Sequence, residues 1–281
     1  MRIALIGPGA IGSTFAYQLA KAGHDVTVVA RGARLRWLEQ ERAIVRHDSQ
    51  RAPVTVSAEL DSKVAWDLLI VTVLATQVEP LLPVLRASAA RRVVFMFNTF
   101  ESLAPLREAV GAERFSFAFP GGVFTLLTEG RIRPQIRSGT SASEPALAKL
   151  FCDAGIPTVF ESDMQSWLRS HGALVVPLMA MGTVVCTRKS GASWRESRGH
   201  AAAFAAGIAT VRAVGSDLRP GAVAWMARLP LVLITAALWA LSRTKIIREL
   251  GLLGATEPRM LIDMMSAAAP ALAGPLRDVR P

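Results

Sequence analysis

The sequence of 281 residues predicts two domains of different class: an α/β domain with a parallel sheet over residues 1–163, and an all-α helical domain over residues 164–281. Two observations lead to this prediction. In the first part of the chain, short runs rich in Val, Ile and Leu alternate with helical patterns, which is typical of a parallel sheet covered on both faces. From Met164 onward no strand pattern remains, and apolar residues recur at helical spacing.

The first elements form a strand–helix–strand unit. RIALIG (2–7) predicts a buried strand, residues 10–22 predict a helix, and HDVTVVAR (24–31) predicts a second strand. A short helix at 33–40 and a short β excursion over 41–60 follow. This order begins a doubly wound sheet.

Two further strands extend the predicted sheet. WDLLIVTV (66–73) and RRVVFMFN (91–98) are strongly apolar, and a helix over 76–89 joins them. Residues 114–124 and 130–140 predict paired strands around a glycine turn, added antiparallel at the sheet edge.

The remaining segments complete the first domain and build the second. A helix over 144–155 ends at a glycine, and IPTVFES (156–162) predicts a last short strand. Helices of the second domain are predicted at 166–188, 199–214, 221–242, 244–251 and 257–268, before a tail rich in Pro and Gly.

The composition excludes several classes of protein. Apolar residues make up 51% of the chain, which suits a globular core, and two cysteines provide neither a disulfide framework nor a zinc site. With only two cysteines, a reducing, cytoplasmic compartment is the expected default, and no signal-peptide pattern is seen. The apolar runs at 172–186 and 229–242 are shorter than the roughly 20 residues that cross a bilayer, so we expect buried helices and no membrane partner.

The formal net charge is +10, but the arginines are dispersed rather than clustered. No helix-turn-helix, aromatic RNA-binding motif or zinc finger accompanies them, so nucleic acid is not an expected partner. A positive field of this kind attracts small anions, dinucleotides included.

A glycine-rich turn connects the first strand to the first helix. Gly7, Gly9 and Gly12 form G-x-G-x-x-G, in which the glycines allow a tight turn, close approach of a pyrophosphate, and close helix–strand packing. The helix N-terminus then offers N–H groups and a partial positive charge to phosphates. This context predicts a Rossmann-type dinucleotide site rather than a plain structural turn, with binding residues Gly7, Pro8, Gly9, Ala10, Ile11 and Gly12.

Arg31 indicates which dinucleotide the site takes. An acidic residue at the end of the second strand selects NAD, whereas an arginine accommodates the 2′-phosphate of NADP. The sequence here is VVARGAR, with Arg31 at the strand end and Arg34 one turn further on, so NADP is the predicted cofactor. The alternative is that Arg31 is one more exposed arginine in an arginine-rich chain.

Three stretches carry a resemblance to a known family: MRIALIGPGAIGSTFAYQLAKAGHDVTVVARG, DLLIVTVLATQV and FMFNTFES. Together they resemble the ketopantoate reductases (2-dehydropantoate 2-reductases). The resemblance implies an NADPH-binding Rossmann domain, a helical second domain, and hydride transfer to the ketone of ketopantoate in a cleft.

The resemblance also implies further cofactor-binding positions. The family usually reads V-K-A-x-Q after its third strand, and this chain reads VTVLATQV, which puts Leu74 in the lysine position and Gln77 in the glutamine position. Asn98 matches the asparagine of the family's H-N-G segment, followed here by Thr99. The alternative for Asn98 is an ordinary turn residue at a strand end.

The helical domain is expected to supply the catalytic residues. The family's proton donor is a lysine in a W-x-K segment, and SWLRSHGALVVPL puts Arg169 closest to that place. A distal glutamate, expected near a T-E-I motif, corresponds loosely to RTKIIREL, where Lys245 stands. Arginine stays protonated and binds anions, so it is a poor proton donor. Lys189, Lys245 and His171 are the candidate replacements, and apolar residues around Val175 and Val176 replace the family's substrate-binding asparagines.

Two functions of different class are compatible with these residues. The first is an NADPH-dependent oxidoreductase of pantothenate biosynthesis, which reduces a 2-oxo acid such as 2-dehydropantoate to the 2-hydroxy acid, with Arg169 and Lys245 as catalytic residues and a homodimer formed through the helical domain. The second is a non-catalytic NADP(H)-binding sensor or interaction protein that has lost the catalytic lysine.

Overall fold

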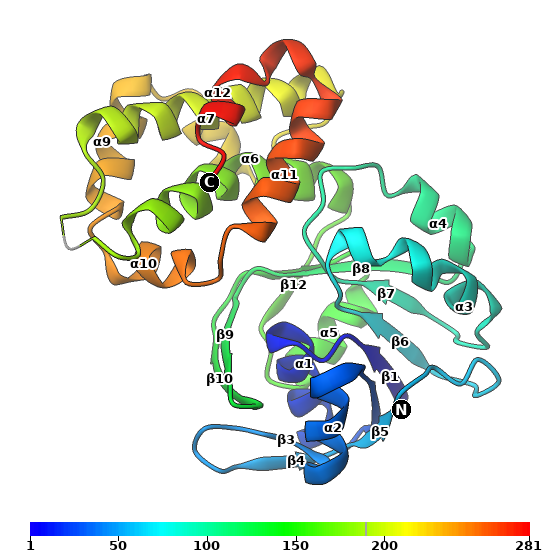
Figure 1. Ribbon diagram of the computed structural model, residues 1–281. Coiled ribbons are helices and arrows are strands. Elements are labelled where there is room, and N and C mark those ends of the chain that lie inside the picture. The colour runs from blue at the N-terminus through cyan, green and yellow to red at the C-terminus, as the bar shows by residue number, and fades with distance from the viewer. Residues whose placement is uncertain (189) are drawn as a thin grey trace. The chain divides into compact units, whose positions relative to one another are not determined.

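The computed structural model describes residues 1–188 and 190–281. The chain divides into two compact units (Figure 1). Unit 1 comprises Met1–Phe97 and Leu103–Met164, and unit 2 comprises Asn98–Ser102 and Gln165–Pro281. The short segment Asn98–Ser102 therefore packs with the helices, although it follows a strand of the sheet in sequence.

The main sheet of unit 1 contains eight strands in the described part of the chain, in the order β12-β11-β8-β7-β6-β1-β2-β5. Every neighbouring pair is parallel except β8 and β11. The strands are β1 (Arg2–Ile6), β2 (Asp25–Val29), β5 (Thr55–Ser57), β6 (Leu68–Val71), β7 (Val93–Phe95), β8 (Phe115–Pro120), β11 (Thr140–Ala142) and β12 (Thr158–Phe160). The predicted α/β class with a largely parallel sheet is confirmed.

The central strands of this sheet are buried along their length because helices cover it. The helical elements of unit 1 are α1 (Ala10–Lys21), α2 (Gly32–Glu41), η1 (Ala75–Gln77), η2 (Glu79–Leu81), α3 (Leu82–Ala87), α4 (Ala104–Val110) and α5 (Pro145–Asp153). Phe15 of α1 meets Phe151 of α5 edge to face, with ring centroids 5.0 Å apart, in the core. The single helix predicted over 76–89 is instead three short pieces, since prolines occupy the first turns of η2 and α3.

The region from 114 to 140 departs from the prediction. β8 joins the main sheet parallel to β7, and only β11 adds antiparallel to β8. β9 (Val123–Thr128) and β10 (Arg131–Ile136) form a separate antiparallel hairpin. The chain leaves the sheet at a glycine pair, where a Cβ on Gly122 would lie 2.1 Å from the carbonyl of Arg137. The β excursion over 41–60 contains a second small hairpin of β3 (Ala43–Val45) and β4 (Arg51–Pro53).

Unit 2 is helical, as predicted. Its elements are α6 (Met164–Val185), α7 (Trp194–Ala213), α8 (Gly221–Met226), α9 (Leu231–Leu241), α10 (Lys245–Gly251), α11 (Thr256–Ala268), η3 (Pro270–Leu272) and α12 (Gly274–Asp278). Pro230 ends the single helix predicted over 221–242, because it stands at the N-cap of α9. The tail rich in Pro and Gly contains η3 and α12.

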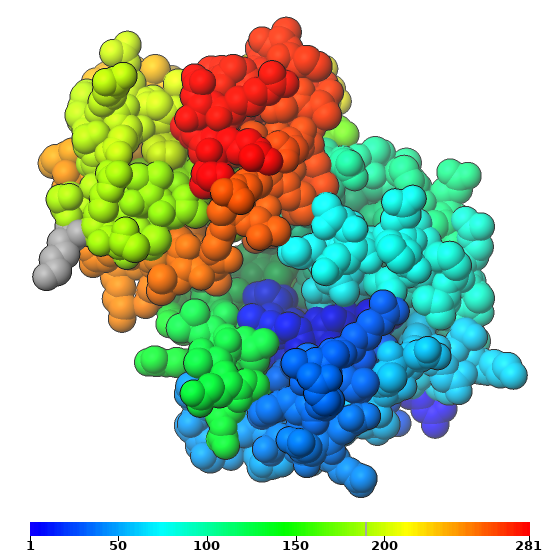
Figure 2. All heavy atoms as spheres, viewed as in Figure 1, coloured from blue at the N-terminus to red at the C-terminus, as the bar shows by residue number. Residues whose placement is uncertain are grey.

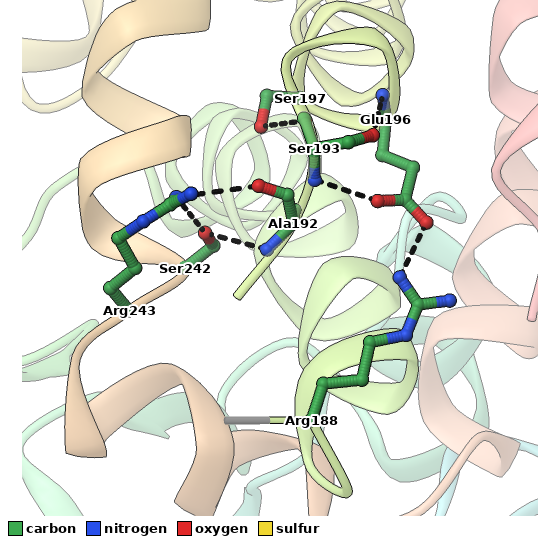
Figure 3. Close-up of polar contacts among 7 residues, drawn as sticks. All are labelled: Arg188, Ala192, Ser193, Glu196, Ser197, Ser242 and Arg243. Carbon is green, nitrogen blue, oxygen red and sulfur yellow. Dashed lines mark hydrogen bonds and ion pairs between the residues drawn. The ribbon is translucent and has the colours of Figure 1, made fainter. Parts of the chain in front are cut away.

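Helix α7 begins five residues before its predicted start because a capping box fixes its N-terminus (Figure 3). The Ser193 hydroxyl accepts from the Glu196 N–H at 3.2 Å, and the Ser193 N–H donates to the Glu196 carboxylate at 2.7 Å. Arg188 pairs with the other oxygen of Glu196 at 2.7 Å. From the neighbouring helix end, Arg243 donates to the Ala192 carbonyl at 3.3 Å. The turn before α7 is thus held from both sides.

Helix α6 is the one described helix whose length and apolar character would allow it to cross a membrane. It has 22 residues because it starts at Met164, ahead of the apolar run at 172–186 that the sequence suggested was too short. Of its apolar window, 61% is buried inside the structure, as in the core helix of a globular domain.

Candidate functional site

A cavity of about 1090 Å³ lies in unit 1 against the glycine turn. Nine of the ten predicted cofactor-binding residues line it: Gly7, Pro8, Gly9, Ala10, Ile11, Gly12, Arg31, Leu74 and Gln77. Arg34, Glu59, Thr72 and Leu127 also face the cavity. Asn98 does not. The volume is large enough for a drug-sized or nucleotide-sized ligand.

Each glycine of the turn has a distinct steric role. Gly7 has φ +89°, and a Cβ there would lie 2.7 Å from a methyl of Val73. At Gly12 a Cβ would lie 2.4 Å from Thr72 Oγ1, so α1 and the sheet pack too closely for a side chain. At Gly9 a Cβ would meet no atom closer than 4.0 Å. The space beside Gly9 is therefore open to a ligand, as the sequence motif predicts.

The start of α1 presents unpaired backbone donors. Its first intrahelical bond runs from the Ser13 N–H to the Gly9 carbonyl at 2.9 Å. The N–H groups of Ala10, Ile11 and Gly12 come before this bond and have no acceptor within the helix. No acidic side chain stands in the first turn of α1. The helix end therefore suits an anion such as a pyrophosphate.

Arg31 stands at the tip of β2, as the N-cap of α2, and its side chain is exposed. Among the described residues, its guanidinium makes no hydrogen bond and no ion pair. Arg34, one turn further on, donates three hydrogen bonds to other parts of unit 1. Burial lowers the pKa of Arg34 to about 10, which leaves it protonated at neutral pH. Of these two arginines, Arg31 is the one available to a ligand.

Leu74 is the N-cap of the short turn η1, which follows β6 and ends at Gln77. The Leu74 N–H donates to the side-chain carbonyl of Gln77 at 3.2 Å. Where the resemblance implies a lysine, the wall of the cavity is thus apolar. The amide group of Gln77 closes the turn.

Asn98 contacts a carboxylate that the sequence analysis missed. Its Nδ2 donates to Glu257 Oε1 at 2.6 Å, and both residues belong to unit 2. Glu257 lies in the first turn of α11. Burial raises the pKa of its carboxyl group, and the hydrogen bond from Asn98 opposes this shift. The pair therefore combines an amide donor with an acid that keeps its proton to higher pH than an ordinary glutamate.

The stretch ATEPRM contains a T-E pair, Thr256–Glu257, besides the region around Lys245 that the sequence analysis matched to the family's T-E-I motif. This T-E pair was the sequence signal that could have pointed to Glu257. Lys245 is the first residue of α10, with its side chain 81% exposed and its ammonium 3.5 Å from the Glu249 carboxylate. The catalytic role of Lys245 remains a prediction. Its exposed position and its ion pair with Glu249 do not favour that role.

Arg169 holds the segment Asn98–Ser102 against the helices of unit 2. Its Nε donates to the Phe100 carbonyl at 3.2 Å, and one Nη donates to Ser216 Oγ at 2.9 Å. Its guanidinium also lies 5.8 Å from the Phe100 ring centroid. Arg169 thus joins the backbone that carries Asn98 to the end of α7.

The other candidate donors are less suited to acid catalysis. His171 stacks on Trp167 with ring centroids 5.1 Å apart, and desolvation lowers its pKa to about 4, so it is neutral at pH 7. Lys189 lies outside the described residues. Val176 is buried in the core of unit 2, and Val175 packs against that core.

Comparison with known proteins gives a consistent result. The family model "Ketopantoate reductase PanE/ApbA" matches residues 3–139. The chain is 34% identical over 115 residues to a 2-dehydropantoate 2-reductase of Vibrio cholerae serotype O1. That match covers 39% of this chain and 36% of the relative, or about a third of its length.

Solved structures of similar fold cover the whole chain. A PanE/ApbA family ketopantoate reductase from Ralstonia eutropha JMP134 has a TM-score of 0.76 at 19% identity, over 100% of this chain and 96% of that one. A D-mandelate dehydrogenase solved with NADH and anilino(oxo)acetate has a TM-score of 0.62 at 14% identity, over 100% and 98%. At these identities the similarity establishes the fold.

Proposed function

From the match of residues 3–139 to the ketopantoate reductase family model, we propose that this chain is an NADPH-dependent oxidoreductase. It reduces a 2-oxo acid, such as 2-dehydropantoate, to the 2-hydroxy acid, a step of pantothenate biosynthesis. The observation that carries this proposal is the cavity at the glycine turn, with an exposed arginine at the tip of the second strand.

The residues of unit 1 fit a phosphorylated dinucleotide. The N–H groups at the start of α1 would hold the pyrophosphate, and the open face of Gly9 would allow it to approach. The guanidinium of Arg31, which has no partner among the described residues, would pair with the 2′-phosphate. Bound NADPH supplies the hydride for the reaction.

The residues of unit 2 fit the other requirement of carbonyl reduction, a proton for the oxygen. We propose that Glu257 delivers this proton, because its raised pKa keeps the carboxyl group protonated further toward neutral pH. Asn98 holds the acid through one N–H of its amide and has a second N–H to donate to the substrate oxygen. Arg169 positions Asn98 by holding the Phe100 carbonyl.

Turnover assays test the proposal. Loss of NADPH absorbance is followed with 2-dehydropantoate, with a small aliphatic 2-oxo acid and with an aromatic 2-oxo acid. Glu257→Gln is expected to abolish most turnover while cofactor affinity stays unchanged, since glutamine accepts from Asn98 but cannot donate a catalytic proton. Glu249→Gln, at a partly exposed glutamate of unit 2, is the matched control. Equal activity of Glu257→Gln and wild type would refute the role of Glu257.

A specific observation favours the alternative, a non-catalytic NADP(H) sensor. The two lysine positions implied by the family resemblance hold Leu74 and Arg169, and neither side chain is a suitable proton donor at neutral pH. Tight binding of NADPH, with no turnover of any 2-oxo acid in the panel, would support the sensor instead of the reductase.

We also propose a cytoplasmic homodimer. Both cysteines are free, which is compatible with a reducing compartment.

Helix α9 has no charged residue and exposes Val232 and Leu233 by 58% and 52%, together with Leu231, Trp239 and Leu241. An apolar face of this kind is typical of an interface, and a second copy of the chain is the proposed occupant. Light scattering gives the mass, and Leu233→Glu is expected to produce a monomer.

A further inference from the structure

A second arginine of α2, Arg34, is held in a different way from Arg31, and no step of the proposed reaction uses it. Its Nε donates to the Pro8 carbonyl at 2.9 Å. Of its two Nη atoms, one donates to the Gly130 carbonyl at 2.7 Å and the other to Ser13 Oγ at 2.8 Å. The planar guanidinium thus joins the glycine turn, α1 and the loop of the β9–β10 hairpin.

The bond to Pro8 acts on the turn that faces the cofactor. The Pro8 carbonyl accepts from Arg34 and also from Ser13 Oγ, at 2.8 Å. A carbonyl oxygen has two lone pairs, so this acceptor is fully used. The peptide group between Pro8 and Gly9 is thereby fixed, and with it the direction of the helix N–H groups that follow.

The bond to Gly130 holds the loop of the β9–β10 hairpin, on the other side of the guanidinium from the glycine turn. Glu129 and Gly130, the two loop residues, have φ of +50° and +77°, as in a type I′ turn. Leu127, two residues before this loop, lines the cavity. Thr125 of the hairpin is also tied to Thr14 of α1, with 2.7 Å between the two hydroxyl oxygens.

The position of the hairpin against α2 can be followed in the space-filling view. The green atoms of β9–β10 lie beside the blue atoms of α2, in agreement with the bond from Arg34 to the hairpin loop (Figure 2). The guanidinium carbon of Arg34 is 4.8 Å from the Trp37 ring centroid, and a Cβ on Gly130 would lie 2.2 Å from that ring. The loop is therefore packed tightly over this side of α2.

We propose that Arg34 is a positioning residue for the cofactor. It joins the glycine turn and the β9–β10 hairpin into one rigid wall of the cavity, and it leaves recognition of the 2′-phosphate to Arg31. This inference rests on the proposed function, since it assumes that NADPH occupies the cavity. The guanidinium donates to its three acceptors as a cation, and charge-assisted hydrogen bonds are the stronger kind.

Cofactor binding to Arg34→Met gives the first test, with Arg36→Met, an exposed arginine of the same helix, as control. Fluorescence titration with NADPH and with NADH is expected to show that both affinities fall by the same factor, about tenfold, because a turn common to both dinucleotides has loosened. The ratio of the two affinities stays at the wild-type value. Arg34→Lys is expected to be intermediate, since lysine keeps the charge and reaches fewer acceptors.

Hydrogen exchange of the cofactor-free protein gives the second test. Arg34→Met is expected to speed exchange of the amides in residues 123–136, while the strands of the main sheet exchange as in wild type. If Arg34→Met does not fold, Arg34→Lys is used for both measurements.

Three outcomes have distinct meanings. Unchanged affinities and unchanged exchange would overturn the inference, and so would a loss of affinity confined to NADPH, which would mean that Arg34 reads the 2′-phosphate itself. If wild type binds neither dinucleotide, the proposed function fails, and exchange of the hairpin still decides whether Arg34 fixes this wall.

Discussion

Replacement of Arg31 separates recognition of the 2′-phosphate from every other part of the cavity. The side chain is exposed, and no described residue accepts a hydrogen bond from it. Arg31→Met therefore removes a charge without breaking a protein contact, and the free energy of unfolding is expected to change by less than about 0.5 kcal/mol. Arg31→Asp goes further, because it replaces an attraction for phosphate with a repulsion.

The size of the effect follows from the exposure of the guanidinium. The 2′-phosphate monoester carries a charge of about −1.5 to −2 at neutral pH. Two unit charges at about 4 Å interact by about 1 kcal/mol in water, so an exposed Arg31 contributes about 1.5 to 2 kcal/mol. Arg31→Met is then expected to weaken NADPH binding by about 10- to 30-fold. Arg31→Asp is expected to double the loss of binding free energy, which weakens NADPH binding by roughly several hundred-fold.

Calorimetric titration with both dinucleotides measures this prediction. NADH lacks the 2′-phosphate, so its affinity is expected to change by less than about twofold in Arg31→Met. Raised salt is expected to weaken NADPH binding to wild type more than to Arg31→Met, because an exposed pair is screened. Equal losses for NADPH and NADH would show that Arg31 acts on a part common to both, and the assignment to the 2′-phosphate would be wrong.

Three further predictions concern the turn and two buried groups. Gly9→Ala is expected to weaken cofactor binding at unchanged thermal stability, whereas Gly12→Ala, whose Cβ would lie 2.4 Å from Thr72 Oγ1, also destabilises the fold by about 1–3 kcal/mol in calorimetry. His200 is buried with Nδ1 unpartnered among the described residues, and desolvation lowers its pKa from 6.5 to about 4. The free energy of unfolding, measured in urea, is therefore expected to fall by up to about 3 kcal/mol as pH falls through this range. A similar fall in His200→Phe would show that His200 is not its cause. Because burial raises the pKa of Glu257, stability relative to Glu257→Gln is expected to fall as pH rises through that pKa; a gap that does not depend on pH contradicts this.

The parts of the fold that the sequence predicts correctly depend on local constraints. The glycine turn follows from three steric requirements within six residues, each visible in the spacing of the motif. The β1–α1–β2 unit follows from continuous apolar runs separated by a helical period. Proline breaks are also local, so Pro230 was available as a signal that the helix predicted over 221–242 is interrupted.

The parts that the sequence did not predict depend on contacts between distant segments. Asn98 and Glu257 are 159 residues apart, and no local pattern brings a strand-end amide to the first turn of α11. The same holds for β8, which pairs with β7 and not with β10, because the chain leaves the sheet at the glycine pair. The match of the expected glutamate to the region of Lys245 stays a prediction, because an approximate distance along the chain does not identify a position in space.

The substitution of lysine by Arg169 has a chemical consequence that concerns Glu257. Arginine keeps the positive charge and can hold the Phe100 carbonyl, but its proton is not available near neutral pH. A reductase with this arginine needs another acid, and a raised pKa favours a carboxyl group for that role. His171 has a lowered pKa and Lys245 is exposed, whereas Glu257 is buried with a raised pKa and a fixed amide partner. If the proposed function holds, activity should therefore fall as pH rises through the pKa of Glu257, and not through that of a lysine.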